Sequence, residues 1–239
     1  TNFHHATGVH LQSKLAGPSM EGNLYQAVRK IALDHRDEVV RRFPKIMRRV
    51  SGYNLDEFLD QDSMNLAKVV VGSEGTLAIV TESLVNLVDV PTKKGLAVVH
   101  FDDLVDAMES VIPILEHTPS AIELIDRTII SRCRESLGFR HLLNFVEGDP
   151  GCVLLVEFYG ETNSELEDKL SKLANDLVHL RLGYATPWTI DPTEQRQIWS
   201  IRESGLGLLM SVKGDVKPLP FVEDTAVAPE KLPEFIRSF

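Results

Sequence analysis

The sequence predicts an α+β fold in which an antiparallel sheet carries helices on one face. Between residues 96 and 183, short apolar runs typical of strands alternate with segments of helical periodicity. The order strand, helix, strand occurs twice in this stretch, without an exact sequence repeat. Such an order is typical of a ferredoxin-like module, and 239 residues, 43% of them hydrophobic, suffice for one or two cores.

The first part of the chain is predicted to begin as a helix and to become irregular later. Residues 24–43 are predicted to form one amphipathic helix, because apolar side chains recur at intervals of three or four residues. These side chains are Leu24, Val28, Ile31, Val39 and Phe43. Pro44 ends this helix. Residues 44–50 add a short helical turn, and SGYNL at 51–55 forms a loop.

A short linker, PTKKG at residues 91–95, marks a change of pattern. We therefore predict one domain over residues 1–90 and a second over residues 91–239. The second is predicted to contain strands at 96–101, 120–126 and 152–160, and helices at 103–116, 128–138, 161–183 and 192–209.

Capping residues indicate where two of these helices begin and end. Ser164 and Glu167 are predicted to form a capping box, and Gly183 stops the same helix. Asp191 is suited to cap the next helix, because Pro192 fits the first helical position.

Composition and charge exclude several classes of partner. The net charge of −10 argues against binding to nucleic acid or to an anionic membrane, because most of the surface repels a polyanion. Cys133 and Cys152 show no metal or disulfide spacing and are predicted to be reduced and half-buried. No apolar run reaches the roughly 18 residues that a transmembrane segment needs. We therefore expect a cytoplasmic protein whose anionic ligands meet a local basic site.

The stretch VVVGSEGTLAIVTE, residues 69–82, interrupts an apolar run with two glycines. Glycines at this spacing let backbone N–H groups converge on an anion or approach a planar ring. The stretch lacks both the Gly-Lys-Ser/Thr of a Walker A loop and the spacing of a dinucleotide fingerprint. On residues alone, a plain turn and a cofactor loop both remain open.

The stretch IWSIRES holds a second candidate site. On a helix, Trp199 and Arg202 share a face, so the indole can support a guanidinium that points into a cleft. Lys217 follows on an extended segment. The alternative is that both cations form ion pairs with nearby carboxylates such as Glu203, Glu223 or Asp224.

Several motifs together resemble the FAD-linked oxidase family, which includes glycolate oxidase, D-lactate dehydrogenase and D-2-hydroxyglutarate dehydrogenase. VVGSEGTLAIVTE resembles its signature loop, with Ala78 in place of a glycine, and SGYNL resembles its T-G-Y-D/N-L element. The longer segment between these two motifs resembles long members fused to an iron-sulfur half. The other motifs, in the family's order, are IELID, VLLVEFYG, IWSIRES and KPLPFVEDTAV.

This resemblance implies a cofactor loop and a substrate anchor. The residues implied to contact FAD are Gly72, Ser73, Glu74, Gly75, Thr76, Leu77, Ile79 and Val80. Backbone amides and the Thr76 hydroxyl are expected to point at the cofactor. Glu74 is expected to fix the loop by accepting backbone hydrogen bonds, because a carboxylate repels a diphosphate. Arg202 and Lys217 are implied to hold the substrate carboxylate.

The resemblance also implies that the chain is the middle of a larger flavoprotein. It spans the end of a VAO/PCMH-type FAD-binding domain and most of a substrate domain. The implied reaction moves a hydride from a small D-2-hydroxy acid of the lactate, glycolate or 2-hydroxyglutarate class to FAD. The base lies outside this chain, so no catalytic residue is assigned and the chain alone is expected to be inactive.

The resemblance leaves open whether the larger protein holds a divalent metal and iron-sulfur clusters outside this chain. It also leaves open which electron acceptor the protein uses and whether it is membrane-peripheral. An alternative function, in a class other than enzymes, is that of a non-redox, ferredoxin-like module that binds or senses a small anion.

Overall fold

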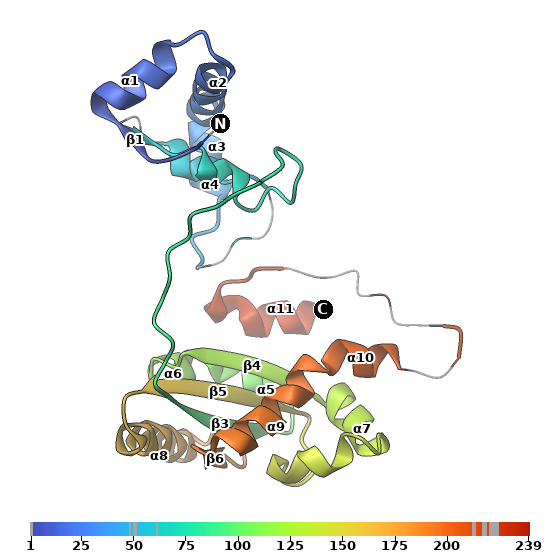
Figure 1. The fold of residues 1–239 in the computed structure, drawn as a ribbon. Helices are drawn as coiled ribbons and strands as arrows, with labels where there is room; N and C mark the ends of the chain where they lie inside the picture. The colour runs from blue at the N-terminus through green and yellow to red at the C-terminus, as the bar shows by residue number, and fades with distance from the viewer. Residues whose placement is uncertain are drawn as a thin grey trace. The chain divides into compact units, whose positions relative to one another are not determined.

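The computed structural model in Figure 1 describes residues 2–47, 49, 52–60, 62–211, 214–216, 219 and 225–239. The chain divides into two compact units, one made mainly of the residues up to Leu87 and the other mainly of the residues from Val88 onward. Each unit has a hydrophobic core of its own.

The first unit is mostly helical. Its helices are α1 (Gly8–Ala16), α2 (Met20–Asp34), α3 (Arg36–Arg42) and α4 (Ala67–Val70), together with the 3₁₀ turn η1 (Leu55–Phe58). A short antiparallel ribbon accompanies them, formed by β1 (Ala6–Thr7) and β2 (Ser63–Met64).

The single helix predicted over residues 24–43 is two helices. α2 begins earlier than predicted, because the Ser19 hydroxyl accepts a hydrogen bond from the Gly22 N–H at 3.0 Å. It ends at His35, where α3 starts. The helical turn predicted over residues 44–50 is wrong for the described part of that range, which contains no helix.

The buried face of α2 is rotated relative to the predicted stripe. Tyr25 and Ala32 are fully buried, whereas Leu24 and Ile31 are 38% and 47% exposed. A Cβ at Gly22 would lie 2.3 Å from a backbone oxygen of the turn after α1. The face that carries this glycine therefore lies against that turn, and it brings Tyr25 into the core.

The second unit is built on a four-stranded sheet, formed by β3 (Lys93–Phe101), β4 (Ala121–Asp126), β5 (Cys152–Gly160) and β6 (Trp188–Thr189). The strand order is β4-β5-β3-β6, and each neighbouring pair is antiparallel, as predicted. The helices are α5 (Leu104–Glu109), α6 (Val111–Leu115), α7 (Arg127–Glu135), α8 (Asn163–Leu180), α9 (Pro192–Glu203), α10 (Gly205–Met210) and α11 (Leu232–Ser238). The 3₁₀ turns are η2 (Arg140–Phe145) and η3 (Pro229–Lys231).

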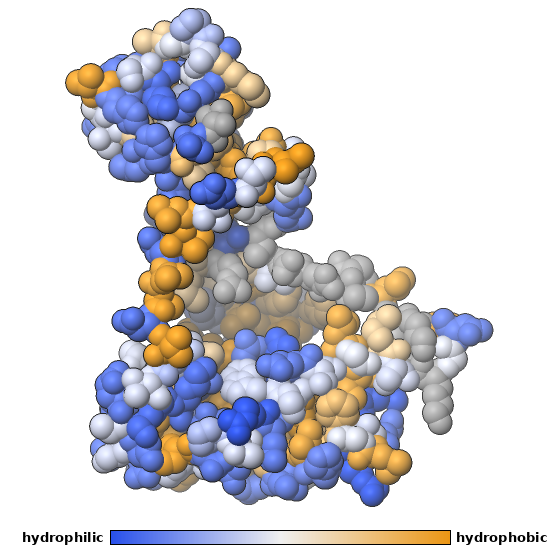
Figure 2. All heavy atoms as spheres, in the orientation of Figure 1, coloured by the Kyte–Doolittle hydropathy of each residue, from blue (hydrophilic) through white to orange (hydrophobic). Residues whose placement is uncertain are grey.

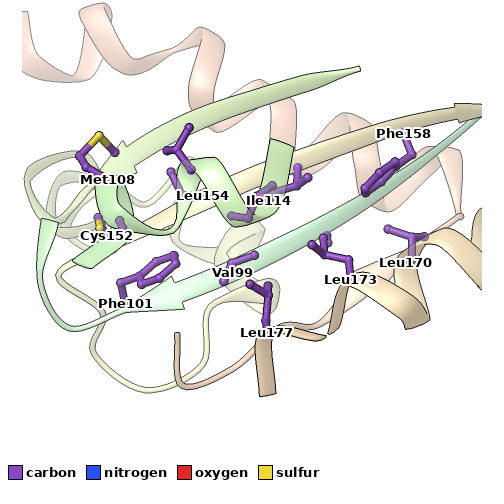
Figure 3. Packing of buried hydrophobic residues seen from close by; sticks show 14 of the residues in the cluster. Val99, Phe101, Met108, Ile114, Cys152, Leu154, Phe158, Leu170, Leu173 and Leu177 are labelled. Atoms are coloured by element: carbon purple, nitrogen blue, oxygen red, sulfur yellow. The ribbon is translucent and has the colours of Figure 1, made fainter. Parts of the chain in front are cut away.

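Helices cover both faces of this sheet, so the prediction of helices on one face is wrong. On one face, α5, α6 and α8 pack against Val99, Leu154 and Phe158 (Figure 3). On the other face, α7, α9 and α10 pack against Val98 and Leu155. Strands β3 and β5 are buried along most of their length. A strand that is apolar on both sides requires cover on both sides.

The helix ends agree only partly with the predicted caps. The Thr162 hydroxyl, not Ser164, caps α8 by accepting a backbone N–H at 3.2 Å. This helix ends at Arg181, which adopts the left-handed conformation, before Gly183 is reached. Asp191 caps α9 as predicted and accepts two backbone N–H groups at 2.7 and 3.0 Å.

The helix predicted over residues 192–209 is also two helices. It divides at Ser204 into α9 and α10. Cys133 and Cys152 are free, as predicted, but fully buried, and burial raises the pKa of Cys152 to about 12. Across the described residues, no helix combines the length and the apolarity that crossing a bilayer requires.

Candidate functional site

The GSEGT sequence after α4 forms a tight loop, here named the GSEGT loop. Gly72 and Gly75 have φ of 79° and 73°, and Glu74 has φ of 51°, so the loop depends on left-handed backbone. The Thr76 N–H and hydroxyl both donate to the Ser73 carbonyl, at 2.9 and 2.6 Å. The hydroxyl proton of Thr76 is therefore used inside the loop.

The GSEGT loop presents free backbone donors on an open side. The N–H groups of Gly72, Glu74 and Gly75 have no hydrogen-bond partner within the described part of the chain. A Cβ added at either glycine would meet no atom within 4 Å. Unpaired N–H groups on an open glycine backbone are suited to bind an anion, so the loop fits the approach of a diphosphate-bearing cofactor such as FAD.

Glu74 does not hold the loop in the expected way. Its carboxylate is exposed and makes no hydrogen bond or ion pair with any described residue. The contacts that close the loop come from Thr76 and Ser73 instead. The carboxylate is solvated, which leaves the backbone as the surface that an anion meets.

An extended apolar segment, residues 77–90, follows the GSEGT loop. Its exposed apolar side chains are Leu77, Ile79, Val80, Leu84, Val85, Leu87, Val88 and Val90. Figure 2 shows hydrophobic side chains gathered along this segment. It pairs with no described strand, so Leu77, Ile79 and Val80 lie next to the loop on open, apolar chain.

Arg202, near the end of α9, contacts a carboxylate on the sheet. Its Nε donates to Oε2 of Glu123 on β4 at 3.0 Å, and Nη2 lies 3.0 Å from the same oxygen in an ion pair. The two side chains are 47% and 39% exposed. Nη1 has no partner among the described residues, so one edge of the guanidinium is free. An ion pair is found, as the alternative prediction had it, but with a different carboxylate.

Glu123 was missed by the sequence reasoning. The signal that could have found it is the carboxylate between apolar residues in IELI, because a charge on a strand is stabilised by an opposite charge beside it. Lys217, the second predicted anchor, lies outside the described residues.

Trp199 does not support Arg202 as expected. No described cation lies over its ring, which packs beside the core on the α9 face of the sheet. Its indole N–H is buried and has no hydrogen-bond partner in the part of the chain that the structure describes. An unpaired buried donor is costly, so this N–H is suited to an acceptor on a ligand.

A groove of about 750 Å³ runs beside α9, lined by Lys94, Glu157, Pro192, Gln195, Arg196, Trp199 and Glu203. Glu157 is a buried carboxylate, and Lys94 Nζ lies 3.3 Å from it. A smaller cavity of about 190 Å³ lies between η2, β6 and α9. In the described ranges, no three His, Cys, Asp or Glu side chains gather as a metal site.

Comparison with known proteins gives a family and several relatives. The family described as FAD linked oxidases, C-terminal domain, matches residues 90–239. D-2-hydroxyglutarate dehydrogenase of Pseudomonas putida is 30% identical over 238 positions, which cover 96% of this chain and 24% of that protein. The protein of the same name in Escherichia coli is 26% identical, covering 91% and 22%.

A third relative has a different name. D-lactate dehydrogenase of Anaerostipes hadrus is 27% identical over 203 positions, covering 83% of this chain and 39% of that protein. The chain therefore spans about a quarter of the length of the D-2-hydroxyglutarate dehydrogenases that it matches.

Proposed function

Because the chain belongs to the FAD-linked oxidase family, through the C-terminal domain of that family, we propose that it is part of an FAD-dependent dehydrogenase. Its substrate is a small D-2-hydroxy acid of the 2-hydroxyglutarate, lactate or glycolate class. The family match over residues 90–239 carries this proposal. Relatives named for D-2-hydroxyglutarate and D-lactate support the substrate class.

The GSEGT loop is the proposed contact with FAD. When bound, FAD accepts the hydride from the carbon that bears the substrate hydroxyl. The N–H groups of Gly72, Glu74 and Gly75 would bind the diphosphate or adenine side, because they are unpaired and open. Leu77, Ile79 and Val80 would supply apolar contact. For the Thr76 hydroxyl, whose proton is donated to the Ser73 carbonyl, we propose the role of closing the loop.

Arg202, with Lys217, is the proposed anchor for the substrate carboxylate. The free edge of the Arg202 guanidinium supports this role, since Glu123 occupies only the Nε side. A carboxylate bound by charge-assisted hydrogen bonds fixes the orientation of the neighbouring carbon. Trp199 and Glu203 flank Arg202 along α9 and line the adjacent groove, which offers room for the rest of a small acid.

The proposal extends to the fold and the domains. The second unit is proposed to be ferredoxin-like, supported by the strand order β4-β5-β3-β6 with α5, α6 and α8 on one face. In this view α7, α9 and α10 are additions on the other face. Residues 1–90 are proposed to be the end of a VAO/PCMH-type FAD-binding domain, and residues 91–239 most of the substrate domain.

The remaining groups of the proposal lie outside this chain. They are a divalent metal, iron-sulfur clusters and the base, and the electron acceptor is left unassigned. The non-redox, anion-binding module is the weaker alternative, because the matched relatives are named dehydrogenases.

The direct test is reduction of bound flavin by the substrate. The protein that contains this chain is purified with its flavin and mixed, without oxygen, with D-2-hydroxyglutarate, D-lactate or glycolate. At least one acid is expected to bleach the flavin absorbance band, and the L-enantiomer of a chiral acid is the matched control. A fully flavin-loaded protein that no D-2-hydroxy acid or glycolate reduces would refute the proposal.

A further inference from the structure

The GSEGT loop is exposed, so packing does not hold its shape. Ser73, 5% exposed, is its one buried residue. Glu74 keeps a φ of 51°, in the left-handed region that residues with a Cβ rarely adopt. Strained backbone persists only where its surroundings determine it, so polar contacts from elsewhere must fix this loop.

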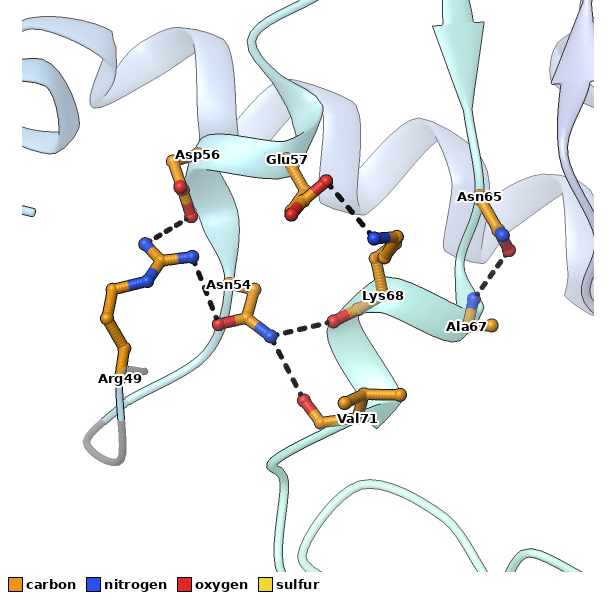
Figure 4. A network of polar contacts seen from close by, with 8 residues as sticks. All are labelled: Arg49, Asn54, Asp56, Glu57, Asn65, Ala67, Lys68 and Val71. Carbon is orange, nitrogen blue, oxygen red and sulfur yellow. Dashed lines mark hydrogen bonds and ion pairs between the residues drawn. The ribbon is translucent and has the colours of Figure 1, made fainter. Parts of the chain in front are cut away.

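Asn54 fixes the end of the helix from which the loop departs. Its Nδ2 donates to the carbonyl oxygens of Lys68 at 3.1 Å and Val71 at 3.2 Å (Figure 4). Carbonyls in the last turn of a helix lack partners within that helix, and Asn54 supplies a donor to two of them at α4. Gly72 follows directly, so these two hydrogen bonds determine where the loop begins.

Tyr53 holds the other end of the loop. Its hydroxyl oxygen lies 3.0 Å from Oγ1 of Thr76. The Thr76 hydroxyl already donates its single proton to the Ser73 carbonyl, so Tyr53 is the donor in this pair. Of two consecutive residues, Tyr53 therefore contacts the last residue of the GSEGT loop, and Asn54 contacts Val71, the residue directly before its first.

Arg49 sets the orientation of the Asn54 amide. Its Nη2 donates to Oδ1 of Asn54 at 3.5 Å, which leaves Nδ2 toward α4 (Figure 4). Arg49 is itself held, because its Nη1 lies 2.7 Å from Oδ1 of Asp56 and its guanidinium lies over the Phe43 ring. The Arg49 side chain is only 19% exposed, so water competes little for these contacts.

From these contacts we infer that Asn54 and Tyr53 are positioning residues for FAD. They hold the free N–H groups of the GSEGT loop in the arrangement that receives the diphosphate, without touching FAD themselves. The inference rests on the proposed function of the loop and names the residues through which that function is maintained.

The first test measures the dissociation constant of FAD. FAD is titrated into the flavin-free form of the protein that contains this chain, and binding is followed by quenching of flavin fluorescence. Asn54→Ala is expected to raise the Kd about tenfold, because two hydrogen bonds to the end of α4 are lost. Asn54→Asp is expected to raise it at least as much, since it keeps the Arg49 contact but turns an acceptor toward two carbonyls.

Asn65 provides a matched control at the opposite end of the same helix. Its Oδ1 accepts a hydrogen bond from the Ala67 N–H at 3.0 Å (Figure 4). Asn65→Ala is expected to lower the melting temperature to a similar extent as Asn54→Ala. Its Kd for FAD is expected to change less than about twofold, because the hydrogen bond lies away from the loop.

The second test is a double-mutant cycle between Tyr53 and Thr76. Tyr53→Phe, which keeps the ring, is expected to raise the Kd of FAD about threefold. In a Thr76→Val background it is expected to change nothing further, because Tyr53 acts through the Thr76 hydroxyl.

The outcomes separate the inference from the proposed function. Wild-type FAD affinity in Asn54→Ala, or additive effects of Tyr53→Phe and Thr76→Val, would overturn the positioning role. If Gly75→Val, which alters the loop itself, weakens FAD binding in the same experiment, the proposed loop function survives that result. If Gly75→Val also binds FAD normally, the loop is not the FAD contact and both proposals fail.

Discussion

Replacing each partner of the Arg202–Glu123 pair tests whether the pair serves substrate binding or only stability. The two side chains are 47% and 39% exposed, and such pairs contribute about 0–1 kcal/mol. Loss of the pair is therefore expected to lower the melting temperature by no more than about 4 °C. A larger effect on kinetics than on stability would assign the pair to the site.

Removal of the Arg202 side chain is expected to weaken binding of the transition state strongly. A charge-assisted hydrogen bond contributes roughly 1.5–3 kcal/mol, so Arg202→Ala should lower kcat/KM by about one to two orders of magnitude. Arg202→Lys should restore only part of this, because an ammonium lacks the planar fork of the guanidinium.

Glu123→Gln is expected to have a smaller and opposite effect. The amide oxygen still accepts from Arg202, so the guanidinium keeps its place. The substitution removes the negative charge of Glu123. At roughly 7 Å in water, that charge repels a substrate carboxylate by about 0.6 kcal/mol. KM should fall about two- to threefold with little change in kcat.

The assay is steady-state kinetics on the flavin-loaded protein, with melting curves to verify folding. Arg132→Ala is the matched control, because Arg132 pairs with Glu135 at 3.0 Å in the same unit. This control should retain the kinetics of the wild type. Unchanged kcat/KM in a folded, flavin-loaded Arg202→Ala protein would refute the anchor role and leave Arg202 a surface ion-pair residue.

Two further predictions concern the loop and the sheet. Gly75→Val should abolish flavin retention, whereas Gly8→Val, at a similar open and positive-φ position, should not; normal flavin content in both would contradict this. Burial lowers the pKa of His100, whose Nε2 accepts the Glu147 N–H at 3.1 Å. As the pH falls, the unfolded chain therefore takes up a proton on His100 before the folded chain does. Below about pH 6.5 the free energy of unfolding should decrease as the pH falls, by up to 1.4 kcal/mol per pH unit. His100→Gln should flatten this slope in urea unfolding, and an unchanged slope would contradict the assignment.

The sheet was predictable where one pattern dominated the sequence. The strand CVLLVEFYG is apolar on both faces, and it is buried along most of its length. The same pattern should have predicted cover on both faces, because a one-sided sheet alternates apolar and polar residues. In α2 the predicted buried residues, Leu24 and Ile31, are each one position before the residues that are buried, Tyr25 and Ala32. The close approach of the backbone at Gly22 determines which face is buried.

The candidate site was predictable as separate motifs but not as contacts. Glycines at positions 72 and 75 announce left-handed backbone, and both have it. The sequence could not show that Tyr53 reaches Thr76, because a contact across 23 positions depends on the path of the chain between them. It also could not choose the partner of Arg202, since several carboxylates lie nearer in sequence than Glu123 does.

The two contacts missed by sequence reasoning have a common physical origin. The GSEGT loop and Arg202 are both exposed, as groups must be if they are to meet a ligand. Exposed groups are not fixed by the apolar packing that orders a core, so each needs a polar partner elsewhere in the chain. Tyr53 and Asn54 supply that partner for the loop, and Glu123, in the middle of a sheet strand, supplies it for Arg202. We therefore expect Tyr53 and Asn54 of SGYNL, and Glu123 of IELID, to act by holding the groups that would bind FAD and substrate, so that exchanging these side chains changes ligand affinity as well as stability.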